Sequence, residues 1–175
     1  MLWIKTFFGI LFQTSLLGIF LYLPALTLNW PDALLFLTVH FLITILASAY
    51  LLIVKPASIE ARMNYDSETQ PKEDRLATFL MLSAIVVGLS LAPIDIFHLN
   101  LSLSFEGNIK NIGLGIYILG MLFVMASMNA NEFAETTVNI QEERGQKVID
   151  TGIYSMVRHP MYTGFIFFIL SLIHI

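Results

Sequence analysis

The densest polar chemistry of this 175-residue chain lies between Val148 and Gly164, in the sequence VIDTGIYSMVRHPMYTG. Arg158 and His159 come directly before Pro160, and an apolar run follows. Proline fits the first turn of a helix, and the residue before a proline is biased away from helical geometry. We therefore expect a helix to begin at Pro160. Its N-terminus would present unpaired N–H groups and the positive end of the helix dipole, which suit an anionic or polar ligand.

The same residues have a simpler interpretation. Basic residues and tyrosine are common at membrane interfaces, where they serve only as anchors. Spacing alone leaves both interpretations open.

The heptapeptide Arg-His-Pro-Met-Tyr-Thr-Gly at 158–164, preceded by Gly-Ile-Tyr at 152–154, resembles a known signature. It is similar to the Arg-His-Pro-x-Tyr-x-Gly pattern of the isoprenylcysteine carboxyl methyltransferase family, small integral membrane enzymes related to the phospholipid N-methyltransferases. The resemblance covers 141–164 and, upstream, only the hydrophobic layout. It implies S-adenosylmethionine as methyl donor and a lipophilic acceptor, with a carboxylate such as an isoprenylcysteine-like group as the methylated function.

The resemblance also implies roles for individual residues. Arg158 is the candidate catalytic residue, because a guanidinium can pair with a carboxylate. No metal site is expected, since Glu132 and Glu135 have no histidine partner at helical spacing and fit a solvated face better. The candidate cofactor-binding residues are Gln141, Gln146, Lys147, Val148, Ile149, Tyr154, His159, Pro160, Met161 and Tyr162.

One departure from the family concerns the C-terminus. Family members continue past the signature into a second helix that returns to the cytoplasm and completes the site. Here 16 residues run from Pro160 to Ile175, about 24 Å of helix against a hydrocarbon core of about 30 Å. The resemblance therefore leads us to expect a chain truncated at its C-terminus.

Two other functions compete with the methyltransferase. NADPH-dependent sterol-type reductases share a similar signature, but they tend to carry Asn before the tyrosine and Glu after the glycine. Met161 and Phe165 stand at those positions, which favours the methyltransferase. The third alternative is a non-catalytic membrane protein.

Composition sets the fold class. The chain is 57% hydrophobic and 13% charged, with a mean hydropathy of +0.76, whereas a soluble domain carries roughly 25% charged residues. We expect one all-α integral membrane domain over 1–175, because the apolar runs are too long for barrel strands. The absence of cysteine excludes a thiolate site. The net charge of −4 argues against a nucleic-acid partner. The expected partners are the bilayer and a lipophilic small molecule. The sequence leaves the oligomeric state open.

The apolar runs predict about five membrane-spanning helices. The third should end before Pro93, where proline interrupts the pattern. A short helix on the membrane surface is expected at 58–65. In the long polar loop 129–157, two alternating runs favour a small hairpin within 137–149. The predicted spans are 2–28, 33–54, 76–92, 109–128 and 160–175.

Three residues inside these spans have two interpretations each. His40 is a functional candidate by its position in a membrane helix, although a buried histidine bonded to a neighbouring helix is favoured. Gly113 and Gly115 resemble a glycine pair that phospholipid methyltransferases use near the cofactor. Close packing between helices is the favoured interpretation of this pair.

The basic residues predict the orientation. In the five-span layout, eight of the nine fall on one side and Lys110 alone on the other. The positive-inside rule places the eight in the cytoplasm. We therefore expect a multi-pass protein of the cell (inner) membrane, with its N-terminus and the loop 129–157 cytoplasmic. The eight are Lys5, Lys55, Arg62, Lys72, Arg75, Arg144, Lys147 and Arg158.

Overall fold

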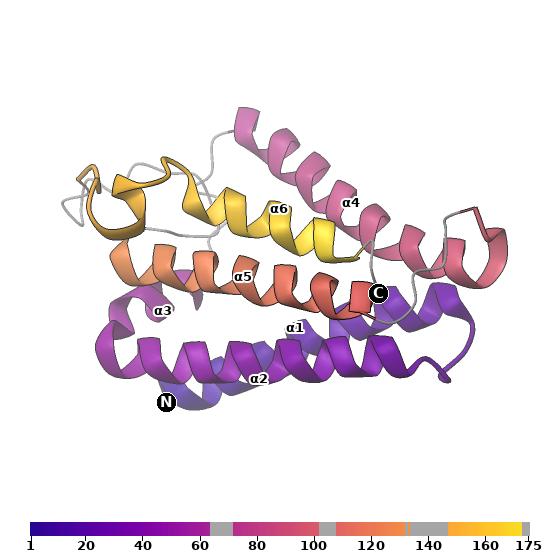
Figure 1. Ribbon diagram of the computed structural model, residues 1–175. Helices are drawn as coiled ribbons and strands as arrows, with labels where there is room; N and C mark the ends of the chain where they lie inside the picture. Colours follow the sequence, from indigo (N-terminus) through magenta and orange to yellow (C-terminus); the bar gives the residue numbers. More distant parts are fainter. Residues whose placement is uncertain (64–71, 102–107, 132, 134–146, 173–175) are drawn as a thin grey trace.

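The computed structural model describes residues 1–63, 72–101, 108–131, 133 and 147–172, and every regular element among them is helical. Within these residues there are four long α-helices and two short ones (Figure 1). Helix α6 packs along α5, and α1 packs against both α2 and α4. The elements are α1 (Leu2–Ala25), α2 (Pro31–Val54), α3 (Pro56–Met63), α4 (Lys72–Ile94), α5 (Asn108–Ala130) and α6 (Pro160–Leu172).

The prediction of an all-α membrane protein is confirmed. Helices α1, α2 and α5, together with Leu82–Leu99, are long and apolar enough to cross a membrane. Helix α6 is apolar but shorter, with 13 residues. Large apolar side chains point outward, among them Phe12 (70% exposed) and Leu46 (69% exposed). In a bilayer these side chains face hydrocarbon rather than water, which explains why the helices are apolar on all sides.

The predicted end of the third span before Pro93 is wrong. Helix α4 continues through Pro93 to Ile94 and runs directly into a π-helical turn, Asp95–Leu99. Proline lacks an N–H donor and its ring crowds the carbonyl four residues earlier, and local widening of the helix accommodates such a defect. The turn ends at Asn100 in left-handed geometry, with a φ of 53°.

An aromatic cluster joins α2, α5 and α6 in the middle of the bundle. The rings of Phe36 and Tyr117 are 4.9 Å apart, and Phe168 packs against both. His40 Nδ1 lies 2.6 Å from the Tyr117 hydroxyl, and both residues are buried. This hydrogen bond between α2 and α5 confirms the interpretation of His40 as a buried histidine bonded to a neighbouring helix.

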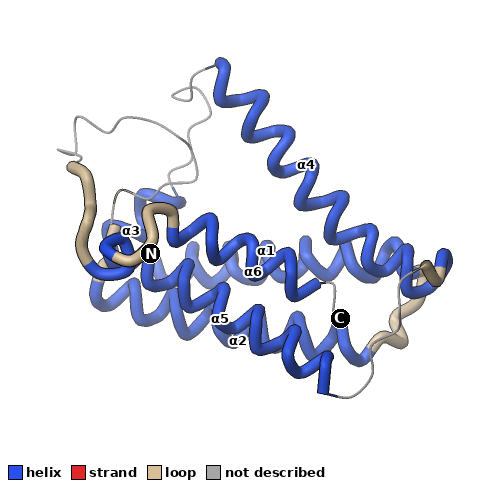
Figure 2. The backbone as a smooth tube through the Cα atoms, turned by 45° about the horizontal axis from the view of Figure 1, so that its top comes forward, coloured by secondary structure: helices blue, strands red, loops and turns tan. Residues whose placement is uncertain are grey.

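Helix α4 departs from the bundle along its length (Figures 1 and 2). Its C-terminal half is held by α1, with Leu89 buried in the core, while the N-terminal half diverges and exposes Leu76, Phe79 and Leu80. Helix α3 covers most of the predicted short helix at 58–65 and crosses one end of the bundle. Its location on the membrane surface stays a prediction. The predicted hairpin falls largely outside the described residues.

Candidate functional site

One end of the bundle gathers the residues that the sequence singled out. Here α1 begins, α2 ends, α3 crosses, α5 ends and α6 begins (Figure 1); we call this the signature end. At the opposite end Lys110 pairs with Asp32, which joins the N-termini of α5 and α2. The described basic residues of the signature end are Lys5, Lys55, Arg62, Lys147 and Arg158.

The chain enters α6 through a tight turn. Gly152 has a φ of +60°, in the left-handed region that residues other than glycine rarely adopt. It opens a 3₁₀ turn, Gly152–Ser155, in which the Ser155 hydroxyl donates to the Gly152 carbonyl at 2.7 Å. A Cβ built on Gly152 would lie 3.6 Å from that of Ala130. The glycine of the Gly-Ile-Tyr motif thus sets the path of the chain against the end of α5.

Helix α6 begins at Pro160, as predicted. Pro160 is fully buried, and the His159 carbonyl accepts the N–H of Thr163 at 3.1 Å. His159 is therefore the residue that caps the helix, and it is exposed together with Arg158. The N–H groups of the first helical turn have no earlier carbonyl within the helix to bond.

The rings of His159 and Tyr162 form a stacked pair at this helix start. Their centroids are 5.6 Å apart and their planes meet at 26°. Tyr162 is 56% exposed. The prediction that residues three apart share one face of the helix is confirmed for this pair, and together they offer a flat, hydrogen-bonding surface.

Two glycines bring α6 close to α5. A Cβ on Gly120 would lie 2.7 Å from the Gly164 carbonyl oxygen, and one on Gly164 would lie 2.6 Å from the Gly120 oxygen. Only glycine allows backbones to approach this closely. The last residue of the signature thus serves helix packing, a role that the sequence did not suggest.

The favoured packing role of the other glycine pair is not borne out at Gly115. Nothing in the described part of the chain comes within 4 Å of a Cβ built there. Gly113 is buried. The close crossing of α5 and α6 lies further along, at Gly120.

Arg62 also belongs to this end, although the sequence did not single it out as a site residue. Its Nη2 atom donates to the Met161 sulfur at 3.5 Å, which ties α3 to the first turn of α6. Burial lowers the pKa of the Arg62 guanidinium, and the nearby Tyr154 phenol opposes that shift. The Tyr154 hydroxyl also lies 3.4 Å from Asn131 Nδ2. Arg62, Tyr154 and Met161 therefore converge, although they come from three separate segments.

Other predicted site residues lie further out. Lys147 is exposed, Val148 is 91% exposed and Ile149 is half-buried. Arg158 has no hydrogen-bond or ion-pair partner among the described residues. The remaining two predicted cofactor residues, Gln141 and Gln146, and the glutamates Glu132 and Glu135 lie outside the described residues.

Comparison with known proteins bears on this same part of the chain. Residues 109–174 match the family model of phospholipid methyltransferases. The matched stretch contains α5, the entry turn and α6, and therefore both the signature and the glycine crossing. The match supports a membrane methyltransferase in general. No curated protein and no solved structure matched the chain.

The residues present fit an S-adenosylmethionine-type ligand. Two polar atoms near the signature end, Arg62 Nε and Asn129 Oδ1, are buried with no partner among the described residues. An exposed aromatic pair stands at the start of α6. No group of three or more metal-ligating side chains occurs in the described segments.

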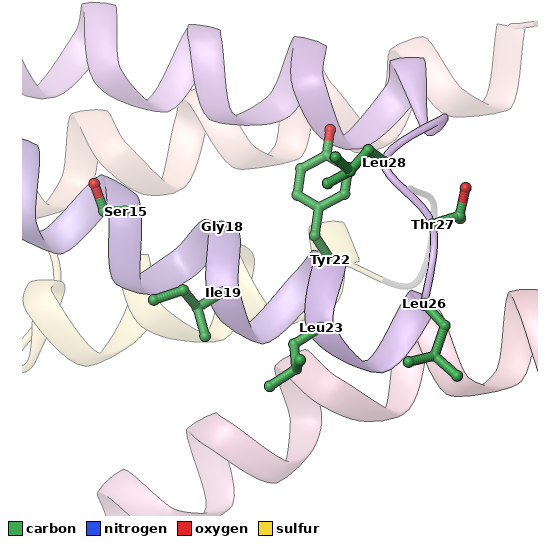
Figure 3. A pocket seen from close by; sticks show the side chains of 8 residues that line it. All are labelled: Ser15, Gly18, Ile19, Tyr22, Leu23, Leu26, Thr27 and Leu28. Carbon is green, nitrogen blue, oxygen red and sulfur yellow. The ribbon is translucent and has the colours of Figure 1, made fainter.

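A groove lies away from the signature end. It is an open groove of about 540 Å³ along the last turns of α1 and the turn that follows it (Figure 3). Its walls are mostly apolar, with the ring of Tyr22 at its centre. This groove is distinct from the signature.

Proposed function

We propose that this protein is a membrane-embedded methyltransferase that uses S-adenosylmethionine and acts on a lipophilic acceptor. The observation that carries the proposal is the place of the Arg-His-Pro-x-Tyr-x-Gly segment. It forms the first turn of α6, inside the stretch that matches the phospholipid methyltransferase family, at one end of a bundle of membrane-length helices. A cofactor from water and an acceptor from the bilayer can meet only at such an end.

The acceptor function that we favour is a carboxylate, such as that of an isoprenylcysteine-like group. Bound S-adenosylmethionine supplies an electrophilic methyl group. A carboxylate is already ionised at neutral pH, so no residue of the chain has to act as a general base. Arg158, exposed before α6 and free of partners among the described residues, can bind that carboxylate through a charge-assisted pair.

The ring pair of His159 and Tyr162 would then bind and orient the cofactor. The tyrosine ring can stack on an adenine and both side chains can form hydrogen bonds. Pro160 fixes the turn from which the two rings project. Alignment and exclusion of water at this face would supply much of the rate enhancement. In this proposal Tyr154, Met161 and the segment 147–149 complete the cofactor site, together with Gln141 and Gln146.

We propose that the signature end is cytoplasmic and that 1–175 acts as one unit in the cell membrane. Five described basic residues lie at this end, and Lys110 is neutralised by Asp32 at the other. Excess basic residues mark cytoplasmic ends. A cytosolic cofactor would then have direct access to the site.

Calorimetry of the detergent-purified protein with two probes tests the proposal. S-adenosylhomocysteine should bind, and NADPH should bind more weakly or not at all. The residues behind this expectation are Met161 and Phe165, which differ from the reductase pattern. Binding of NADPH without binding of S-adenosylhomocysteine would overturn the proposal in favour of a reductase.

A further inference from the structure

Two buried polar atoms of opposite character lie unpaired near the signature end. Arg62 Nε is a hydrogen-bond donor on a cation, and Asn129 Oδ1 is an acceptor. Neither has a partner among the described residues. A buried donor or acceptor without a partner is unfavourable, more so when it is charged. Protein interiors therefore rarely leave such groups unpaired unless a ligand or water completes them.

The contacts around Arg62 place it against the proposed cofactor residues. Among the described residues its Nη2 atom donates only to the Met161 sulfur, a weak acceptor. The Tyr154 phenol lies close enough to oppose the lowering of the guanidinium pKa by burial. Within the described part of the chain no carboxylate lies within ion-pair distance of Arg62. A guanidinium stays protonated in proteins, so its positive charge is retained without a counterion.

The contacts around Asn129 place it on neighbouring segments of the same end. Ser58 of α3 donates to the carbonyl of Met128 at 3.4 Å, and Arg62 follows Ser58 by one helical turn on the same face. On the other side, Asn131 contacts Tyr154. Asn129 thus lies in the last turn of α5, between two residues whose contacts lead to α3 and to the entry turn of α6.

We propose that Arg62 and Asn129 bind the two ends of a zwitterionic group, the oxyanion at the Arg62 guanidinium and the ammonium at the Asn129 amide oxygen. This inference rests on the proposed function. The same chemistry is carried by the amino-acid end of S-adenosylmethionine and by an aminoethyl phosphate headgroup of a membrane lipid. Both sources have access to this end, one from water and the other from the bilayer.

The test is calorimetry on the full chain with each intact zwitterion and with probes that lack one of its charges. For the cofactor arm the probes are S-adenosylhomocysteine, its decarboxylated analogue and its deaminated analogue. For the lipid arm they are phosphatidylethanolamine and phosphatidylglycerol, which keeps the phosphate but lacks the ammonium, each incorporated in nanodiscs with the protein. The unsubstituted protein should bind the intact zwitterion of one arm roughly tenfold or more tightly than the probe lacking one charge, as expected for a charge-assisted hydrogen bond.

Substitutions assign the two ends. Arg62→Gln should remove the preference for the carboxylate or the phosphate, and Asn129→Leu should remove the preference for the ammonium. Arg62→Lys, which keeps the charge, should retain part of the first preference. Lys5→Gln is the matched control, because Lys5 is an exposed cation of the same end, and it should change neither.

Each outcome decides between the two proposals. If S-adenosylhomocysteine binds but all cofactor analogues bind equally and the two lipids do not differ, the inference fails while the proposed function stands. The same holds if Arg62→Gln and Lys5→Gln weaken binding to the same extent. If the unsubstituted protein binds no probe, both fail. Should Arg62→Gln not fold, the comparison of probes on the unsubstituted protein still decides.

Discussion

At the scale of single residues, the exposed rings of His159 and Tyr162 offer the most direct test of the proposed function. His159→Ala removes one ring of the pair and one hydrogen-bonding group from the start of α6. A hydrogen bond contributes about 0.5–1.5 kcal/mol net, so S-adenosylhomocysteine binding should weaken roughly tenfold. Thermal stability should change little, because the His159 side chain is exposed. Calorimetry and thermal unfolding of the same preparation measure both quantities.

A different result would assign His159 another role. If the variant unfolds while its folded fraction binds S-adenosylhomocysteine normally, His159 is an interface residue and the functional interpretation of the signature is wrong here.

The buried pair His40 and Tyr117 should behave in the opposite way. Tyr117→Phe removes the hydroxyl bonded to His40 and leaves a buried imidazole without its partner, at a cost of about 1–3 kcal/mol. Unfolding in detergent should shift to lower temperature, with ligand binding unchanged. The double variant His40→Leu with Tyr117→Phe removes both polar groups and should recover part of the loss. Loss of binding with unchanged stability would instead make His40 functional.

Sequence reasoning reached His159 and Tyr162 because they belong to a contiguous motif whose spacing fixes a common helix face. It did not assign Arg62 or Asn129 to the site. Arg62 entered only as one of eight basic residues, and nothing in PASIEARM distinguishes it from an exposed cation. Its burial against Met161 depends on how α3 packs on α6, a tertiary contact between residues nearly 100 positions apart.

At the scale of the elements, the crossing of α5 and α6 depends on two glycines. Gly120→Ala would place a methyl group 2.7 Å from a backbone oxygen and 2.9 Å from the Phe167 Cβ. Overpacking of this kind typically costs about 1–3 kcal/mol, and the helices must separate to relieve it. We expect a lower unfolding temperature and weaker binding of S-adenosylhomocysteine, because the signature forms the start of α6.

The matched control is Gly115→Ala on the same helix, where a Cβ meets nothing within 4 Å in the described structure. That variant should be neutral or stabilised by up to about 1 kcal/mol through helix propensity. Equal effects of the two substitutions would contradict the packing role of Gly120.

At the scale of the elements, the structure also explains why the prediction that the third span ends before Pro93 was wrong. A proline inside a helical pattern normally marks an end, and local sequence holds no sign that the chain continues. The helix persists because Pro93 is buried and the following π-helical turn is anchored from outside: the Asp95 carboxylate accepts the N–H of Leu101 at 2.8 Å. His98 Nε2 also lies 2.8 Å from the Pro24 carbonyl of α1.

For the whole molecule, orientation is the property to test. The chain contains no cysteine, so single cysteines can report sidedness without background. Val148→Cys lies at the signature end and Leu28→Cys in the turn at the opposite end, where these side chains are 91% and 87% exposed. In intact cells an impermeant maleimide should label Leu28→Cys only. Val148→Cys should react only after the membrane is opened, and labelling of Val148→Cys in intact cells would reverse the proposed orientation.

Much of this architecture was accessible from the sequence. The starts of the helices at Leu2, Pro31, Asn108 and Pro160 agree with the predicted spans to within two residues, because long apolar runs and prolines determine them locally. The oblique course of α4 was not accessible. An apolar helix face looks the same whether it meets lipid or another helix, so composition cannot tell where a helix leaves the bundle.

The contact between Gly120 and Gly164 has one further consequence. Gly164 follows Pro160 by four residues, about one turn of helix, and each residue of a helix adds about 100° of rotation and 1.5 Å of rise. The glycine crossing therefore fixes the angular phase of α6 and, with it, the direction in which the first turn faces. One residue inserted between Pro160 and Gly164 would rotate His159 by about a quarter-turn around the helix axis. His159 would then no longer face the direction that the glycine crossing sets. The same insertion after Gly164 would leave the direction of His159 unchanged. The glycine crossing therefore sets the orientation of the signature around the axis of α6.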